Sequence, residues 1–292
     1  MLRSLLAPLV FGALLLAGTW SALTASSTVN TQDNQNNQNK QNNNAASNRN
    51  AQKREKTEKV DRNKALTAEQ VAELTVLVYG SRPVLAQIRR NGVERGRITR
   101  YMTDGKTEEA TYERRFITGE SADKDKIRLD QKMPTLEYSL IFGEGRLFGV
   151  INGAAFTPRQ DAADAFLSQH WHSIENLLRY KENGATINLV GKDKQKGLDL
   201  YVLDVSDKDK RTTRYYISAT TFRVLWLEYE EGNSGAPLKY SKRFSDYRYA
   251  QSTLVPYRTI LMEEGKQTQE TRILTVTFGV KVDDTLFKNP QA

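Results

Sequence analysis

The sequence contains no cysteine, only two histidines and only seven prolines among its 292 residues. Because no disulfide can form, an oxidising compartment would neither cross-link the chain nor threaten a thiol, and stability must come from the core. The sequence also lacks a nucleophile elbow, a glycine-rich phosphate loop and an HExxH motif, and Gly143–Gly149 has the wrong spacing for a dinucleotide fingerprint. We therefore expect no catalytic residue, no cofactor and a protein that is not an enzyme.

Metal-ligand patterns are equally scarce. His170 and His172 lie two positions apart, and on a helix such neighbours face different directions, so we do not expect them to share a metal ion. We predict His170 to be a hydrogen-bonded core residue and His172 to be exposed. Asp204, Asp207 and Asp209 surround a lysine-rich turn without the glycine that a calcium loop needs for its sharp bend. We interpret this turn as a solvated hairpin and predict no metal site.

Long apolar runs are missing except near the start of the chain. Arg3 gives a positive lead, an uncharged and mostly apolar run follows as far as Gly18, and small residues come next. This order is typical of a secretory signal, so we predict that residues 1–27 direct export to the periplasm. The alternative is an uncleaved inner-membrane anchor over residues 4–25, since a span needs only about 20 mostly apolar residues. Lipid attachment at an N-terminal cysteine is excluded, because the chain has none.

Apolar side chains are almost absent from residues 28–64, where an asparagine- and glutamine-rich stretch precedes mixed charges. Such a composition cannot bury enough surface to fold, and we predict a disordered tether. Nine of the 43 Lys and Arg residues and four of the 35 acidic residues lie before Ala65, so the remainder carries a net charge of only +3 out of +8. No nucleic-acid partner is therefore expected. The alternative to a solvated spacer is a basic segment that contacts an anionic membrane surface.

The folded part is expected to begin with a short helix and a run of polar strands. Thr67–Gln70 fits a capping box, and apolar residues at helical spacing continue to Gly80. From Val84 the pattern becomes that of strands, with hairpin turns expected at Asn91-Gly92 and Asp104-Gly105. We interpret the charges of these strands as a solvated outer face rather than a site for a phosphate or an acidic ligand. The charged residues are Arg89, Arg90, Arg95, Arg97, Arg100, Glu113, Arg114 and Arg115.

A second helix is predicted between the two groups of strands. Thr157 is its candidate N-cap, Pro158 suits the first helical position, Gln160 completes a capping box, and Asn183-Gly184 supplies the stop. A helix with one apolar stripe at this place in the chain is expected to cover the dry face of a sheet. The stripe consists of Ala163, Phe166, Leu167, His170, Ile174, Leu177 and Leu178.

Seven strand-like runs rich in aromatic and β-branched residues fill residues 185–288. Near the end, Leu274, Val276 and Phe278 alternate with threonines, which is typical of an antiparallel sheet with one wet and one dry face. The predicted fold class is α+β, with a large curved antiparallel sheet and two or more helices over its concave face. We expect residues 65–292 to form this single domain. A closed barrel is the alternative to a half-barrel, because the sequence does not fix the strand number.

Four short phrases stand out in the last hundred residues: Tyr201 with Leu203, Asp246-Tyr247-Arg248, Pro256-Tyr257, and the closing Asp284, Leu286, Phe287 and Pro290. In these phrases the sequence resembles the superfamily of the periplasmic lipoprotein carrier LolA. The resemblance implies a half-barrel sheet with helices over its concave side, an exported location and an apolar cavity that in some members carries lipid or acyl chains. The long tether and the polar first strands depart from a bare carrier, which speaks against a freely diffusing role.

We therefore expect an exported envelope protein that binds lipid or the acyl chains of a lipoprotein, with a carrier or sorting role. The alternative is a non-catalytic scaffold or regulatory protein that binds another envelope protein through the same fold. Membrane contact would come through the N-terminal segment. The predicted apolar lining consists of Tyr201, Leu203, Trp226, Tyr257, Leu261, Leu274, Val276 and Phe278, with Phe166 and Trp171 from the covering helix.

Overall fold

The computed structural model describes residues 65–232 and 237–289. The predicted signal or anchor (1–27) and the predicted tether (28–64) lie outside the described residues. Within the described ranges, no helix has the length and apolar character needed to cross a membrane.

The described residues form one 13-stranded antiparallel sheet. Its strands are β1 (Asn91–Tyr101), β2 (Thr107–Ile117), β3 (Lys126–Lys132), β4 (Glu137–Gly143), β5 (Arg146–Ile151), β6 (Ala154–Phe156), β7 (Thr186–Gln195), β8 (Leu198–Ser206), β9 (Thr212–Ser218), β10 (Val224–Glu231), β11 (Leu238–Ala250), β12 (Thr253–Glu263) and β13 (Lys266–Phe278). Neighbours in the chain pair with one another, and pairing of β1 with β13 joins the first six strands to the last seven. Strands β6 and β7 are the two edges, so the sheet is open rather than closed into a barrel.

Four α-helices accompany the described sheet: α1 (Ala68–Tyr79), α2 (Arg82–Ile88), α3 (Gln160–Trp171) and α4 (Ile174–Leu178). Thr67 and Gln70 form both bonds of the predicted capping box at the start of α1. The expectation of a strand from Val84 and a turn at Asn91-Gly92 was wrong. Pro83 lies in the first turn of α2, where a missing N–H costs nothing, and β1 begins at Asn91.

The predicted second helix is broken in two at His172 and Ser173. It begins later than expected, with Arg159 rather than Thr157 at the N-cap. At the break, the carbonyl of His172 accepts a bond from Lys242 Nζ at 2.6 Å, and the carbonyl of Ser173 accepts one from Tyr215 Oη at 2.8 Å. These bonds to the sheet replace bonds within a continuous helix, so tertiary contacts explain the kink.

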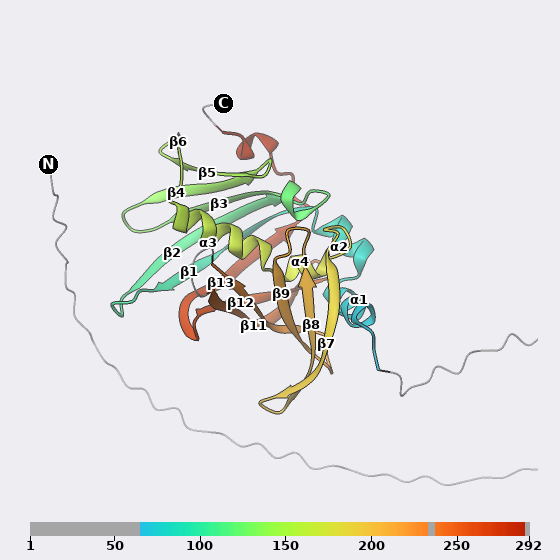
Figure 1. The fold of residues 1–292 in the computed structure, drawn as a ribbon. Coiled ribbons are helices and arrows are strands. Elements are labelled where there is room, and N and C mark those ends of the chain that lie inside the picture. Colours follow the sequence, from blue (N-terminus) through green and yellow to red (C-terminus); the bar gives the residue numbers. More distant parts are fainter. Residues whose placement is uncertain (1–64, 233–236, 290–292) are drawn as a thin grey trace, which may run out of the picture. The chain divides into compact units, whose positions relative to one another are not determined.

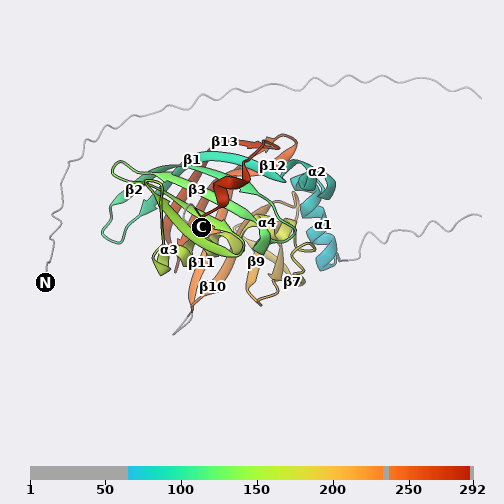
Figure 2. The ribbon, with the colours of Figure 1, turned by 90° about the horizontal axis from the view of Figure 1, so that it is seen from above.

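The sheet curls around α3 and α4. Seen from above, β1, β12 and β13 lie on one side of α4, while β7 and β9 lie on the other (Figure 2). Helix α3 contacts the first six strands and the last seven. The Trp171 ring packs edge-on against Phe142 of β4, with 5.9 Å between the ring centroids, and Ser168 Oγ donates to Tyr229 Oη of β10 at 3.1 Å. The predicted fold class is therefore confirmed as an α+β half-barrel whose helices cover the concave face (Figure 1).

Two apolar clusters occupy the concave side of the sheet. The first joins α1 and α4 to β7–β10, and its members Tyr79, Leu203, Tyr215 and Leu227 are all 0 % exposed. The second gathers residues of β2, β3, β4, β12 and β13 beneath α3. A third, small cluster lies on the opposite face of β8–β10, since its members alternate with those of the first cluster along β8.

Candidate functional site

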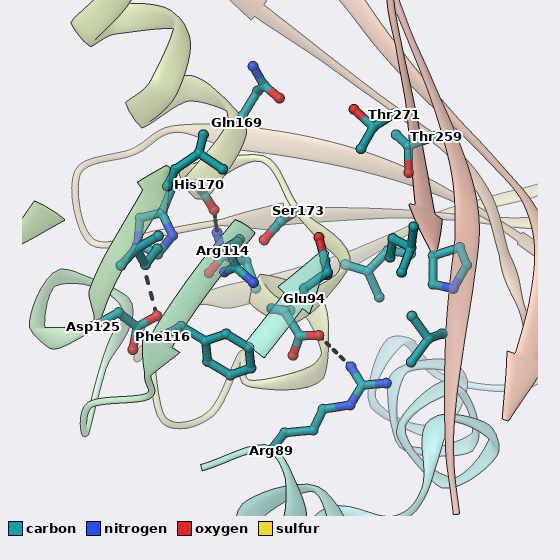
Figure 3. A pocket seen from close by; sticks show the side chains of 18 of the residues that line it. Arg89, Glu94, Arg114, Phe116, Asp125, Gln169, His170, Ser173, Thr259 and Thr271 are labelled. Atoms are coloured by element: carbon teal, nitrogen blue, oxygen red, sulfur yellow. Dashed lines mark hydrogen bonds and ion pairs between the residues drawn. The ribbon is translucent and has the colours of Figure 1, made fainter. Parts of the chain in front are cut away.

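A cavity of about 330 Å³ lies between the concave face of the sheet and helices α3 and α4. Strands β1, β2, β3, β11, β12 and β13 contribute side chains to one side of it, and the two helices contribute to the other (Figure 3). Its volume is at the lower end of the range of about 300–1,000 Å³ that is usual for small-molecule pockets.

Two glycines of β1 make room for an aromatic floor in this cavity. A Cβ atom at Gly92 would lie 2.8 Å from the Phe116 ring, and one at Gly96 would lie 2.7 Å from the Tyr112 ring. Phe116 and Tyr112 are the directly opposite residues on β2, so each ring lies over the backbone of β1. The bare backbone of β1 thus allows both rings to lie flat instead of filling the cavity. Ile127, Phe166, Ile273 and Phe278 also belong to its apolar lining.

The end of the cavity near α2 is held by Arg89, which is buried. Its Nη1 donates to Glu175 of α4 and its Nη2 donates to the carbonyl of Leu254 on β12 at 2.6 Å. The guanidinium carbon also lies 5.3 Å from the centroid of the Phe278 ring. Arg89 therefore links α2, α4 and the sheet, and Glu175 balances its charge.

A second buried ion pair lies beside β3. Arg179 Nη1 donates to both carboxylate oxygens of Asp125 at 3.0 Å, and its Nη2 donates to the carbonyl of Gly119 at 2.7 Å. Burial raises the pKa of Asp125 above its ordinary value, against the influence of Arg179. His170 Nε2 donates to the carbonyl of Ala122 at 2.9 Å, and burial lowers the pKa of His170 to about 4, so the ring is neutral at pH 7. The prediction of a hydrogen-bonded core residue is confirmed for His170.

Lys242 of β11 lines the cavity and is buried. Its Nζ donates to the carbonyl of Gln169 at 3.1 Å and to that of His172 at 2.6 Å, near the end of α3. Burial lowers the pKa of Lys242 to about 7. The expectation that His172 is exposed was wrong: it is 1 % exposed, its ring stacks on Tyr229 at 3.9 Å, and its Nδ1 lies 2.7 Å from Thr213 Oγ1.

Glu94 and Arg114 face each other across β1 and β2 at the centre of the lining. Glu94 Oε1 accepts a bond from Tyr112 Oη at 2.7 Å. Arg114 is half-buried, and its guanidinium carbon lies 4.7 Å from the centroid of the Phe116 ring. Within residues 65–232 and 237–289, no ion pair or side-chain hydrogen bond engages Arg114. The cavity thus holds two paired arginines and one arginine without a partner.

The structure brings only part of the predicted lining together. Phe166 and Phe278 line the cavity, and Tyr257, Val276 and Trp171 pack in the apolar cluster around it. Tyr201 and Leu203 belong to the first cluster beneath α1 and α4, and Leu261 is half-buried. Trp226 lies on the opposite face of the sheet, stacked on Tyr216 at 4.5 Å.

Leu274 differs from the expectation because β13 contains a β-bulge. Arg95 pairs with Thr275 and Gly96 pairs with Ile273, so Leu274 is the extra residue and is 57 % exposed. An extra residue exchanges the two faces of a strand, and the alternation read from Leu274 to Phe278 does not continue past this point. As a result Ile273 and Thr271, rather than Leu274, line the cavity.

The charged lining was missed by the sequence analysis. The charges of the first strands were assigned to one outer face, yet Arg89 is buried at the end of α2 and Arg114 lines the cavity. The strand period contains the missing signal, because Arg114 is adjacent to Glu113 and Arg115 and must point to the other face. In the described part of the chain, no group of three or more His, Cys, Asp or Glu side chains could hold a metal ion.

No protein-family model and no curated protein matches the sequence. Solved structures do match: a LolA superfamily protein from Nitrosomonas europaea is 12 % identical, with a TM-score of 0.54 over 78 % of this chain and 100 % of that one. A DUF1329 family protein from Desulfovibrio piger is 11 % identical, with a TM-score of 0.55 over 78 % of this chain and 99 % of that one. A putative outer membrane lipoprotein-sorting protein domain from Vibrio parahaemolyticus is 13 % identical, with a TM-score of 0.47 over 76 % and 95 %. The resemblance predicted from the sequence is therefore confirmed at the level of the fold: the domain has a LolA-like fold.

Proposed function

We propose that this protein is an exported, non-catalytic binding protein that holds an acyl chain of a lipid or lipoprotein in the cavity beneath α3. The observation that carries the proposal is the cavity of about 330 Å³ that the helices leave unfilled beside an aromatic and aliphatic floor. The LolA-like fold supports it, since an apolar hollow under a covered half-barrel suits a hydrocarbon chain. An export signal in residues 1–27 would place the domain in the periplasm, where such a ligand is available.

The physical basis for binding is the removal of hydrocarbon from water. Each methylene that enters an apolar site contributes about 0.8 kcal/mol, so a chain of about a dozen methylenes would contribute on the order of 10 kcal/mol before the costs of association. Much of the lining is preformed, because Phe116 and Tyr112 are held against the glycines of β1. Little energy is therefore needed to open the site for a chain.

Two measurements on the full-length protein test the proposal. Native mass spectrometry and organic extraction of the purified protein should find a bound acyl species at near-equimolar amount. The protein, once stripped, should bind 1-hexadecanol, a neutral alcohol with a long chain. A clean unliganded protein that also fails to bind the alcohol would contradict the proposal and favour a scaffold that binds another envelope protein.

A matched pair of variants locates the binding. Thr259 lines the cavity and has no side-chain hydrogen bond to lose within the described residues, so Thr259→Phe should fill the space and weaken 1-hexadecanol binding at least tenfold. Thr275→Phe places the same ring on the exposed, opposite face of β13 and should leave binding unchanged. Equal binding by both variants would show that the alcohol is held elsewhere.

A further inference from the structure

Four basic side chains line the cavity, and one of them forms neither an ion pair nor a side-chain hydrogen bond within the described residues. Of the positive side chains in the lining, Arg89 is paired with Glu175 and Arg179 with Asp125. Lys242 is engaged by two helix carbonyls. These bonds explain why each of the three groups is tolerated away from water.

Arg114 is different, because no ion pair or hydrogen bond within the described residues engages its guanidinium. The carboxylate directly opposite, Glu94, accepts the Tyr112 hydroxyl at 2.7 Å and forms no ion pair with Arg114. What the protein does supply is the face of the Phe116 ring, 4.7 Å from the guanidinium carbon. Stacking on a ring holds an arginine in one orientation and leaves its N–H groups free to donate.

Figure 3 shows Arg114 within the cavity, with His170, Ser173 and Glu94 also facing this space. His170 does not compete for an anion, because burial lowers its pKa to about 4 and its Nε2 already donates to a carbonyl. Arg114 is thus the group that an incoming anion would meet, next to the Phe116 and Ile127 floor that would take an apolar chain.

We propose that Arg114 recognises the anionic end of the ligand, so that the cavity selects an amphiphile with one carboxylate or phosphate group over a neutral lipid of the same length. This inference rests on the proposed function, because it assigns a head-group contact to the same cavity. A guanidinium donates two parallel N–H bonds to either kind of anion, and such charge-assisted bonds are stronger in a site shielded from water.

The test compares palmitate with 1-hexadecanol, which share a chain length and differ in charge. The stripped full-length protein should bind palmitate about tenfold to a hundredfold more tightly than the alcohol. Arg114→Met should lose this preference while it still binds the alcohol. The matched control is Arg97→Met on the exposed, opposite face of β1, which should retain the preference in full.

Each result has a distinct meaning. If the native protein binds both ligands equally, or if Arg114→Met still prefers palmitate, the inference is overturned while the proposed function survives. If neither ligand binds, the proposed function itself fails. Competition with inorganic phosphate separates a head-group contact from a site for free anions. Phosphate at millimolar concentration should not displace palmitate. If phosphate displaces palmitate from the native protein but not from Arg114→Met, the ligand of Arg114 is a simple anion rather than an amphiphile.

Discussion

The hollow beneath the sheet has two halves that the protein treats differently. The filled half, formed by the first apolar cluster, receives large side chains from both layers: Leu177 from α4 and Tyr215 from β9 are both 0 % exposed. The cavity half, formed by the residues around the cavity, has Gly92 and Gly96 at inward positions of β1 and threonines at inward positions of β12 and β13. The difference lies in the size of the inward residues, since both halves have a helix above the same kind of sheet.

The filled half also satisfies its polar groups internally. Tyr79 Oη donates to Tyr247 Oη at 3.3 Å, and Tyr215 Oη donates to the carbonyl of Ser173 at 2.8 Å. In the cavity half, Arg114 and the hydroxyl of Thr259 have no such partner within the described residues. Complete packing with complete hydrogen bonding is what a structural core requires, whereas space with free donors is what a binding site requires.

The largest expected effect comes from shortening one apolar side chain to alanine in each half. Leu203→Ala in the filled half should lower the free energy of unfolding by about 2–5 kcal/mol, because it creates a new void in a close-packed core. Ile273→Ala in the cavity half should cost about 1 kcal/mol, because its side chain already borders open space. Urea unfolding of both variants provides the comparison. Equal losses would show that the cavity half is packed as tightly as the filled half.

Much of the fold could be predicted from the sequence, because local patterns determine it. Each of the seven strand-like runs of residues 185–288 corresponds to a strand, and the Thr67 capping box begins α1. Helix α2 was missed because its seven residues include no buried position, so no apolar stripe marks it. The sequence feature that marks this helix is Pro83 in its first turn, rather than an apolar period.

The site was harder to predict, because it depends on which face a residue takes. The β-bulge at Leu274 moves one leucine outside and brings Ile273 inside, and the sequence around it shows an unbroken alternation. Tyr201 was placed in the predicted lining as an inward residue of the curved sheet, and the arrangement of α1 and α4 decides that it lies in the filled half. Polar cavity residues such as Arg114 contradict the expectation that an inward face is apolar.

The second prediction concerns Lys242, which ties the end of α3 to the sheet. Burial lowers its pKa from 10.5 to about 7, so between these values the unfolded chain binds more protons than the folded one. The free energy of unfolding should therefore rise with pH across this window, by at most about 1.4 kcal/mol per pH unit from this group. Lys242→Met should flatten that slope between pH 7 and 9.5 in urea unfolding.

The exposed Lys239 on the same strand supplies the control for this slope. Lys239→Met should leave the pH dependence as it is, because its ammonium group lies in water on the surface of β11. A slope that is unchanged in Lys242→Met would mean that the ammonium group is solvated in the folded protein. The bonds from Lys242 to the helix carbonyls would then not be the contact that holds α3 over the cavity.

The smallest expected effect concerns the ion pairs at the surface of the filled half. Glu73 of α1 contacts Arg82 Nη2 at 2.8 Å, Lys181 Nζ at 2.9 Å and Tyr180 Oη at 2.9 Å. The bond from Arg82, with help from the other two groups, lowers the pKa of Glu73 from 4.5 to about 2. A carboxylate with a depressed pKa stabilises the folded state above about pH 4.5 and loses that contribution as the pH falls to about 2.

The depressed pKa of Glu73 would correspond to roughly 3 kcal/mol at 1.36 kcal/mol per unit, but its side chain is 38 % exposed, and screening by water reduces this to about 1 kcal/mol. Glu73→Gln should therefore be about 1 kcal/mol less stable than the native protein at pH 6 and equally stable near pH 2. Glu69→Gln, on an exposed position of the same helix, should show no such convergence. A deficit that stays constant from pH 6 to pH 2 would mean that Glu73 acts through packing rather than charge, and that the filled half is closed without help from these surface ion pairs.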